Sequence, residues 1–233
     1  MKKERSNNNL NKIANLMLAV GLICLVVPTG LWLNAKYYQW HEVKKWQPVA
    51  RVSADSNGVN PDNAKDGNPK ADGSVDGSAT AGDIADLVAT DPEATGKSIA
   101  FIVIPKLDLS LSIIEGETWS NLAKGPVRVS KTAQIGAVGT SLISGHRTMY
   151  AAPFHDLDKL DIADSVFVYT EQALFVYEVI GIKRVKPDDW SDIKSGGERR
   201  LVLSTCDPMY SAAKRLLIIA QLSDAQKLDG ANR

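Results

Sequence analysis

The chain has 233 residues, 44% of them apolar, and its 27 basic side chains balance its 27 acidic ones. That length suits one domain of ordinary size with additional segments. A net charge of zero argues against a nucleic-acid-binding protein, which needs a basic surface. The two cysteines and three histidines are scattered along the chain and are too few for a structural zinc site.

Residues 16–33 form an apolar run without a charged side chain. At about 1.5 Å of rise per residue, a helix of this length nearly crosses the hydrocarbon core of a bilayer, which is about 30 Å thick. We predict an uncleaved transmembrane anchor. The alternative is a cleaved signal peptide, but its apolar region is usually about 7–15 residues long and ends in a small-residue cleavage site. No such site follows the run cleanly here.

The charges on the two sides of the apolar run do not decide its orientation. Four basic residues precede the run and four follow it before residue 52, so the positive-inside rule gives a tie. Aromatic side chains gather where the run ends. They are typical of a membrane–water interface, and they are equally compatible with a short amphipathic helix lying on the membrane. These aromatic residues are Trp32, Tyr37, Tyr38, Trp40 and Trp46.

Residues 52–97 differ in composition from the rest of the chain. They are rich in Gly, Asp, Asn, Ala and Pro and contain no aromatic residue. Such a segment buries too little apolar surface to offset the entropy lost when it becomes ordered. We predict a flexible spacer with one weak helical turn at 83–88. The aspartates of 62–67 do not form a calcium loop, because Ala64 occupies a ligand position and no Glu stands at the twelfth position.

The pattern from residue 98 to residue 222 favours β-structure. Short apolar or alternating runs predict strands at 99–104, 109–113, 138–144, 165–169, 173–185, 200–204 and 216–222, and short helices at 119–123 and 154–160. Gly, Pro, Asp and Asn separate several of these runs, as expected of turns. About seven strands at this spacing indicate an all-β barrel or sandwich.

Three residues near the ends of predicted strands are candidates for catalysis. Cys206 ends an apolar strand just before a turn, where a thiol is both positioned and reachable. His146 follows Gly145 at the end of another strand, and an imidazole with a pKa of about 6.5 suits proton transfer near neutral pH. Arg215 opens the last strand, and its guanidinium can hold a carbonyl or a developing oxyanion.

Each of these residues also has a purely structural interpretation when it is taken alone. Cys206 is then a buried core cysteine, His146 a surface-loop histidine, and Arg215 a solvated charge at a strand end. His155 is a weaker candidate for a catalytic histidine, because it lies in a polar segment with a helical pattern. The three residues become informative only in combination.

The combination resembles the sortase family of cysteine transpeptidases. Residues 145–157 contain Gly-His-Arg-Thr followed by Ala-Pro-Phe-x-Asp-Leu, which resembles the histidine region of sortases and is most similar to class E, the actinobacterial housekeeping group. Residues 203–206, Leu-Ser-Thr-Cys, resemble the end of the family's TLxTC signature, and Arg215 falls where the family keeps its arginine. Val202 replaces the first Thr of the signature, but both residues are β-branched and similar in size, so the strand should survive.

The resemblance covers about residues 98–222 and implies an eight-stranded sortase-like β-barrel with short helices. It implies the following segments: a cytoplasmic N-terminal tail at 1–15, a transmembrane anchor at 16–33, a juxtamembrane segment and flexible spacer at 34–97, a catalytic domain at 98–224 and a C-terminal tail at 225–233. Sortases act outside the membrane. The resemblance therefore implies a cytoplasmic N-terminus and an extracellular catalytic domain, an orientation that the charges leave open.

Sortases cleave a C-terminal sorting motif, LPXTG or in class E LAXTG, between Thr and Gly. The resemblance implies that Cys206 forms a thioester with the Thr carbonyl, that His146 protonates the departing amine and that Arg215 holds the substrate backbone or the oxyanion. It also implies that Tyr150 and Thr205 line the motif pocket. The implied partners are sorting-motif surface proteins or pilins, an amine of a peptidoglycan precursor or pilin lysine, and membrane lipid. No cofactor, metal or nucleic acid is expected.

Two other functions are compatible with parts of the pattern. An L,D-type cell-wall transpeptidase also uses a cysteine, but its signature places His-Gly close before the Cys, whereas Ser204-Thr205 precede Cys206 here. A non-catalytic membrane-tethered β-domain, such as an adhesin or a degenerate sortase, would need no activated thiol. Reaction of Cys206 with a thiol-directed reagent would distinguish an enzyme from such a scaffold.

Overall fold

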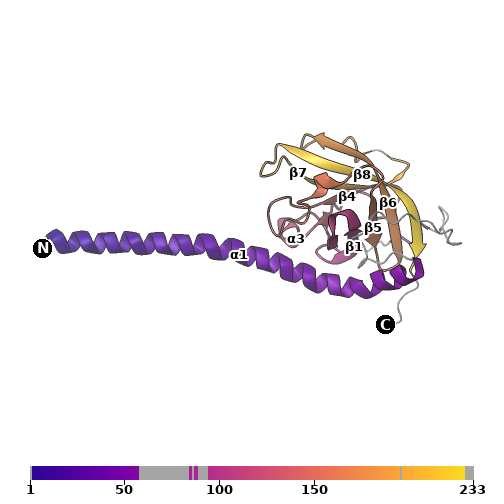
Figure 1. Ribbon diagram of the computed structural model, residues 1–233. Helices are drawn as coiled ribbons and strands as arrows, with labels where there is room; N and C mark the ends of the chain where they lie inside the picture. Colours follow the sequence, from indigo (N-terminus) through magenta and orange to yellow (C-terminus); the bar gives the residue numbers. More distant parts are fainter. Residues whose placement is uncertain (1, 58–83, 86, 89–93, 195, 229–233) are drawn as a thin grey trace.

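The computed structural model describes residues 2–57, 84, 85, 87, 88, 94–194 and 196–228 (Figure 1). One long helix precedes a domain made almost entirely of strands. The elements are α1 (Lys2–Asn57), β1 (Ser98–Ile104), η2 (Pro105–Leu107), β2 (Leu109–Glu115), α3 (Trp119–Leu122), β3 (Val127–Arg128), β4 (Gly139–Ser144), η3 (Leu157–Lys159), β5 (Ser165–Tyr169), β6 (Ala173–Val185), β7 (Arg199–Asp207) and β8 (Lys214–Lys227).

The strands close into a barrel in the order β1-β2-β3-β4-β7-β8-β6-β5, which confirms the predicted eight-stranded fold. The β2–β3 and β4–β7 pairs are parallel, and the remaining neighbours are antiparallel. All seven strands predicted from the sequence form. The pattern misses β3, because a two-residue strand carries no periodicity. The helix predicted at 154–160 is wrong, since only the 3-10 turn η3 forms there.

Strand β1 shows why its sequence is a continuous apolar run. Ile102 and Ile104 belong to the cluster that fills the barrel interior. Phe101 and Val103 alternate with them and belong to an outer cluster that also contains Trp46 of α1. Both faces of the strand are therefore covered, one by the core and one by the helix, and neither face needs polar residues.

The C-terminal part of α1 lies against the outside of the barrel (Figure 1). Gln39 occupies the edge of β2 next to the short β3. Its Nε2 donates to the Ser112 carbonyl at 3.2 Å, and its Oε1 accepts from the Ser112 N–H at 2.9 Å. Trp46 donates from Nε1 to the Ser98 hydroxyl at 2.9 Å. The amide of Gln39 thus pairs backbone groups at a sheet edge that another strand would otherwise satisfy.

The segment after the apolar run is helical, and one expectation about its aromatic residues is wrong. Residues 34–57 continue α1, which therefore includes the first residues, 52–57, of the predicted spacer. Trp46 is only 6% exposed and packs on the barrel, so it does not belong to the predicted interfacial aromatic group. Trp32, Tyr37 and Trp40 are exposed on the helix, as an interfacial position requires.

The predicted spacer also contributes to the barrel core. Ile84 and Leu87 are 9% and 5% exposed and join the interior cluster. The Gly96 N–H donates to the Glu115 carbonyl at 2.8 Å and aligns the chain before β1. Residues 58–83, 86 and 89–93 lie outside the described residues, and 84 and 85 of the predicted turn are helical. A chain that began near residue 95 would therefore lose two core side chains.

Candidate active site

Cys206 lies near the end of β7 on the outer face of the barrel. Leu201 and Leu203 belong to the interior cluster and Val202 to an outer one, so the alternation of the strand places Cys206 outside. The β7–β8 register sets Cys206 directly opposite Arg215. Directly opposed residues of an antiparallel pair share a face, so the half-buried thiol has the arginine as its cross-strand neighbour.

Strand β4 runs parallel to β7 and brings His146 to the same place. The ladder pairs Ser144 with Ser204. It continues through the Gly145 N–H, which donates to the Ser204 carbonyl at 3.1 Å. Two residues beyond the last ladder pair, the two strands reach His146 and Cys206. The structure therefore brings together all three residues that the sequence selected for catalysis, from three adjacent strands.

Contacts from Thr205 and Phe154 hold the turn that carries His146. The Thr205 hydroxyl donates to the Gly145 carbonyl at 2.8 Å. The Phe154 ring packs so closely on Gly145 that a Cβ there would lie 2.7 Å from it, and the Phe154 N–H donates to the His146 carbonyl at 3.0 Å. Thr205 is only 2% exposed. Its hydroxyl holds the histidine turn, and the role in the motif pocket that the resemblance implied stays a prediction.

Arg147 ties the histidine segment to the cysteine segment through buried ion pairs. It is 4% exposed, and its Nη1 donates to Asp207 Oδ1 at 2.6 Å and to the Cys206 carbonyl at 3.4 Å. Its Nη2 lies 2.7 Å from Asp158 Oδ2. Charge-assisted bonds of this kind are strong and directional. The sequence analysis assigned no role to Arg147. Its position directly after His146 was the one feature of the sequence that pointed to the site.

Two aromatic rings surround the His146 imidazole. Its ring centroid lies 6.1 Å from that of Trp119, which meets it edge-on, and 5.2 Å from that of Tyr150. Burial lowers the pKa of His146 below its usual value of 6.5, because removing water disfavours the imidazolium. Among the described residues, none forms a hydrogen bond to its buried Nε2. Sequence reasoning selected Tyr150 but missed Trp119.

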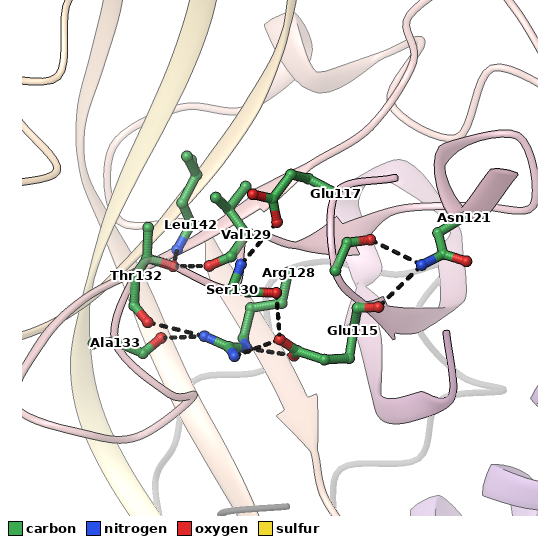
Figure 2. Close-up of polar contacts among 10 residues, drawn as sticks. Glu115, Glu117, Asn121, Arg128, Val129, Ser130, Thr132, Ala133 and Leu142 are labelled. Carbon is green, nitrogen blue, oxygen red and sulfur yellow. Dashed lines mark hydrogen bonds and ion pairs between the residues drawn. The ribbon is translucent and has the colours of Figure 1, made fainter. Parts of the chain in front are cut away.

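A buried polar cluster fixes α3, the helix that carries Trp119 (Figure 2). Arg128 donates to both carboxylate oxygens of Glu115, from Nε and from Nη2, each at 2.6 Å. Asn121 of α3 donates from Nδ2 to the carbonyls of Glu115 and Gly116, both at 3.1 Å. Because the charges are paired and the amide is satisfied, this cluster anchors α3 against the end of β2.

The Arg215 guanidinium is folded back onto the β7–β8 connection. Its Nη1 donates to the carbonyls of Ala212 and Lys214, at 3.3 and 3.2 Å. Ala212 belongs to the β7–β8 connection and Lys214 is the first residue of β8, so a bound substrate carbonyl would compete with these two carbonyls for the guanidinium. Within the part of the chain that the structure describes, no three His, Cys, Asp or Glu side chains gather closely enough to hold a metal ion.

The sortase domain family matches residues 102–223, which is more than half of the chain. The chain belongs to the sortase family. Curated relatives of this sortase include sortase A of Bacillus anthracis, 28% identical over 53% of this chain and 59% of the relative. They also include sortase E1 of Streptomyces coelicolor, 30% identical over 53% of this chain and 40% of the relative. The matched region thus spans about half the length of these two relatives.

Solved structures similar to this sortase include two of class E. Sortase E from Streptomyces avermitilis has a TM-score of 0.52 and 31% identity, covering 60% of this chain and 96% of that one. Sortase E1 from Streptomyces coelicolor with a tripeptide in the active site has a TM-score of 0.55 and 26% identity, covering 62% and 98%. The resemblance to class E that the histidine region suggested is therefore confirmed.

The structure explains why this sortase tolerates Val202 in place of the signature's first Thr. Val202 is fully buried in the outer cluster with Leu142 of β4 and Leu217 of β8. A hydroxyl in this apolar setting would need a hydrogen-bond partner, whereas a methyl group needs none. The substitution therefore preserves the strand that positions Cys206.

Removing the Trp119 ring is expected to raise the pKa of His146 towards 6.5. Trp119→Ala uncovers the imidazole, and renewed hydration stabilises the imidazolium that burial disfavours. An NMR titration of the imidazole signals measures this pKa directly, and the chain has only three histidines to assign. Trp190→Ala removes an exposed tryptophan of the β6–β7 connection and serves as the control. An unchanged pKa in Trp119→Ala would show that other groups desolvate His146.

Proposed function

We propose that this chain is a membrane-anchored sortase. It cleaves a C-terminal LAXTG- or LPXTG-type sorting motif between Thr and Gly and transfers the protein to an amine of a cell-wall precursor or a pilin. The observation that carries the proposal is the placement of Cys206 opposite Arg215 in the β7–β8 ladder, with His146 beside them from β4. A thiol flanked by an imidazole and a guanidinium suits acyl transfer through a thioester.

In the first half of the reaction, the Cys206 sulfur attacks the carbonyl carbon of the motif threonine. The carbonyl oxygen gains negative charge, and Arg215 leaves the carbonyls of Ala212 and Lys214 to donate hydrogen bonds to it. The C–N bond to glycine then breaks, and His146 gives its proton to the departing amine. Its buried Nε2 supports this role, because no hydrogen bond from the described residues competes for that nitrogen. Tyr150, beside the imidazole, lines the motif pocket.

In the second half, an amine of the acceptor attacks the thioester carbonyl. His146 takes a proton from that amine, the C–S bond breaks, and the Cys206 thiolate is released as the new amide forms. The proton that left in the first half is thus recovered in the second, and the site returns to its starting state. The acceptor amine belongs to a peptidoglycan precursor or to a pilin lysine.

The proposed anchor is α1. Residues 11–46 of this helix are long and apolar enough to cross a membrane, and its most apolar part is not covered by protein. We propose that the N-terminus lies in the cytoplasm and the barrel outside. The proposed substrates, sorting-motif surface proteins or pilins, are found on that outer side.

A peptide assay with the full chain in detergent tests the proposal. Peptides with an LAXTG or LPXTG motif are incubated with the protein, with and without an added amine, and a peptide with the same residues in scrambled order is the control. We expect cleavage between Thr and Gly, a product joined to the amine through Thr, and a covalent peptide adduct on Cys206 by mass spectrometry. Absence of the adduct with both motifs would refute the proposal.

A further inference from the structure

The barrel has two different ends, and the site lies at one of them. Strands β4 and β7 finish there, at Ser144 and Asp207, and β8 begins there, at Lys214. We call this end the catalytic rim. Strand β3 is antiparallel to β4 and therefore starts at the rim. Since β2 is parallel to β3 and β1 is antiparallel to β2, β1 starts at the opposite end of the barrel.

Helix α1 follows the barrel in a defined direction relative to the rim. Gln39 contacts the Lys124 carbonyl at 3.2 Å, three residues before β3 starts at the rim. Trp46, further along the helix, contacts Ser98 at the start of β1, and it packs with Leu174 at the start of β6. The helix therefore runs from the rim towards the opposite end, and its apolar N-terminal half leaves the barrel on the side of the rim. Figure 1 shows α3 and the β7–β8 connection on that side.

The distance between the rim and the apolar run is short. The run ends at Leu33, and Ala35, two residues later, is already fully buried. Gln39 lies six residues beyond Leu33, which is about 9 Å along a helix. The headgroup layer on each side of a bilayer core is about 5–8 Å thick. A helix that crosses the core upright with this run therefore places Gln39, and the rim beside it, at the outer edge of the lipid headgroup layer.

The side chains at the rim suit that position. Outside α1, most large apolar side chains that the described residues expose lie on connections that leave or reach the rim. These side chains are Trp119, Met149, Ile162, Trp190, Met209 and Tyr210. Val138 and Ile180, the other two, lie before the start of β4 and within β6. Tryptophan and tyrosine are enriched at membrane–water interfaces, because their rings are apolar and their tips are polar.

We propose that the catalytic rim rests on the bilayer interface, so that the site around Cys206 faces the membrane to which α1 anchors the chain. The partner surface is the lipid headgroup layer. The docked helix sets the orientation, and the exposed apolar side chains of the rim make the contact. This inference rests on the proposed anchoring by α1. It implies that the enzyme works on motifs and amines held close to the membrane surface.

Fluorescence quenching in vesicles tests the orientation. The full chain carries Cys24→Ala and Cys206→Ala, so that one added cysteine takes the fluorophore, at Tyr210→Cys on the rim or at Val138→Cys at the opposite end. Both positions are exposed, at 85% and 58%. The vesicles contain phosphatidylcholine and phosphatidylglycerol, and some headgroups carry a nitroxide quencher. We expect the label at 210 to be quenched several times more strongly than the label at 138.

Adding Gln39→Ala separates the effect of docking from that of anchoring. The substitution leaves the N–H and carbonyl of Ser112 without their partner but does not change the apolar run. Quenching at 210 should then fall towards the level at 138, while the protein still floats with the vesicles. Equal quenching at both positions in the protein that keeps Gln39 would refute the proposed orientation but would not contradict anchoring by α1. A chain that does not float with the vesicles would refute the anchor, and the orientation with it.

Discussion

Replacing Cys206 by alanine is expected to abolish cleavage and transfer of a sorting peptide while the barrel remains folded. The thioester cannot form without the sulfur, and no neighbouring side chain in the described site offers another nucleophile of this kind. The thiol is half-buried on the outer face, and its removal opens no hole in the interior cluster. The free energy of unfolding should change by no more than about 0.5 kcal/mol, as is usual for positions outside the core.

Cys24→Ala is the matched control for this prediction. It removes the other cysteine of the chain, which is exposed on α1. We expect full activity in Cys24→Ala and none in Cys206→Ala, measured as the rate of amine transfer to the peptide. Chemical denaturation of both proteins should give superimposable curves. Motif-specific cleavage by the Cys206→Ala protein would refute the proposed mechanism.

Both Arg215→Lys and Arg215→Ala are expected to lower kcat/KM by about 10²–10³, the usual cost of losing an oxyanion donor. Arg215 stands opposite Cys206 and donates from one nitrogen to the carbonyls of Ala212 and Lys214. If it holds the substrate oxygen in the same directed way, lysine should fail, because an ammonium cannot reproduce the planar fork. The rate of Cys206 alkylation should change much less than kcat/KM, since that reaction involves no substrate carbonyl.

Lys214→Ala provides the comparison for the arginine variants. Lys214 is an exposed cation adjacent to Arg215, opposite Asp207 in the ladder, and its loss changes the net charge equally. We expect it to retain normal kcat/KM. A near-normal Arg215→Lys protein would mean that only the charge matters. Full activity in Arg215→Ala would make Arg215 a solvated strand-end residue, the structural interpretation that its sequence position also allowed.

Strands and motif residues could be predicted from the sequence because their signals are local. An alternating run such as 109–113 carries the period of a strand, and the residues around His146 and Cys206 carry the family pattern. The two-residue β3 has no such signal. Trp119 could not be associated with His146, because their contact depends on how α3 packs after β2. The same applies to Arg147, whose ion pairs join residues far apart in the sequence.

The errors in the N-terminal half have a related cause. Composition predicted a spacer from residue 52, and composition averages over a window, so it does not reveal that Ile84 and Leu87 join the core. The sequence also gave no reason to pair Gln39 with the backbone of Ser112. That contact arises because β3 is too short to cover the edge of β2, a property of the assembled sheet rather than of either segment.

The barrel order has a consequence for how such a protein gains activity when it is delivered across a membrane from its N-terminus. Strand β8 pairs with both β6 and β7, so the last long strand of the chain completes the sheet around Cys206 and supplies Arg215. Pairs such as β1 with β5 and β4 with β7 join distant segments, which makes folding slow. If the barrel lies outside the membrane, as proposed, the emerging chain is inactive until β8 has crossed the membrane, because that strand supplies Arg215.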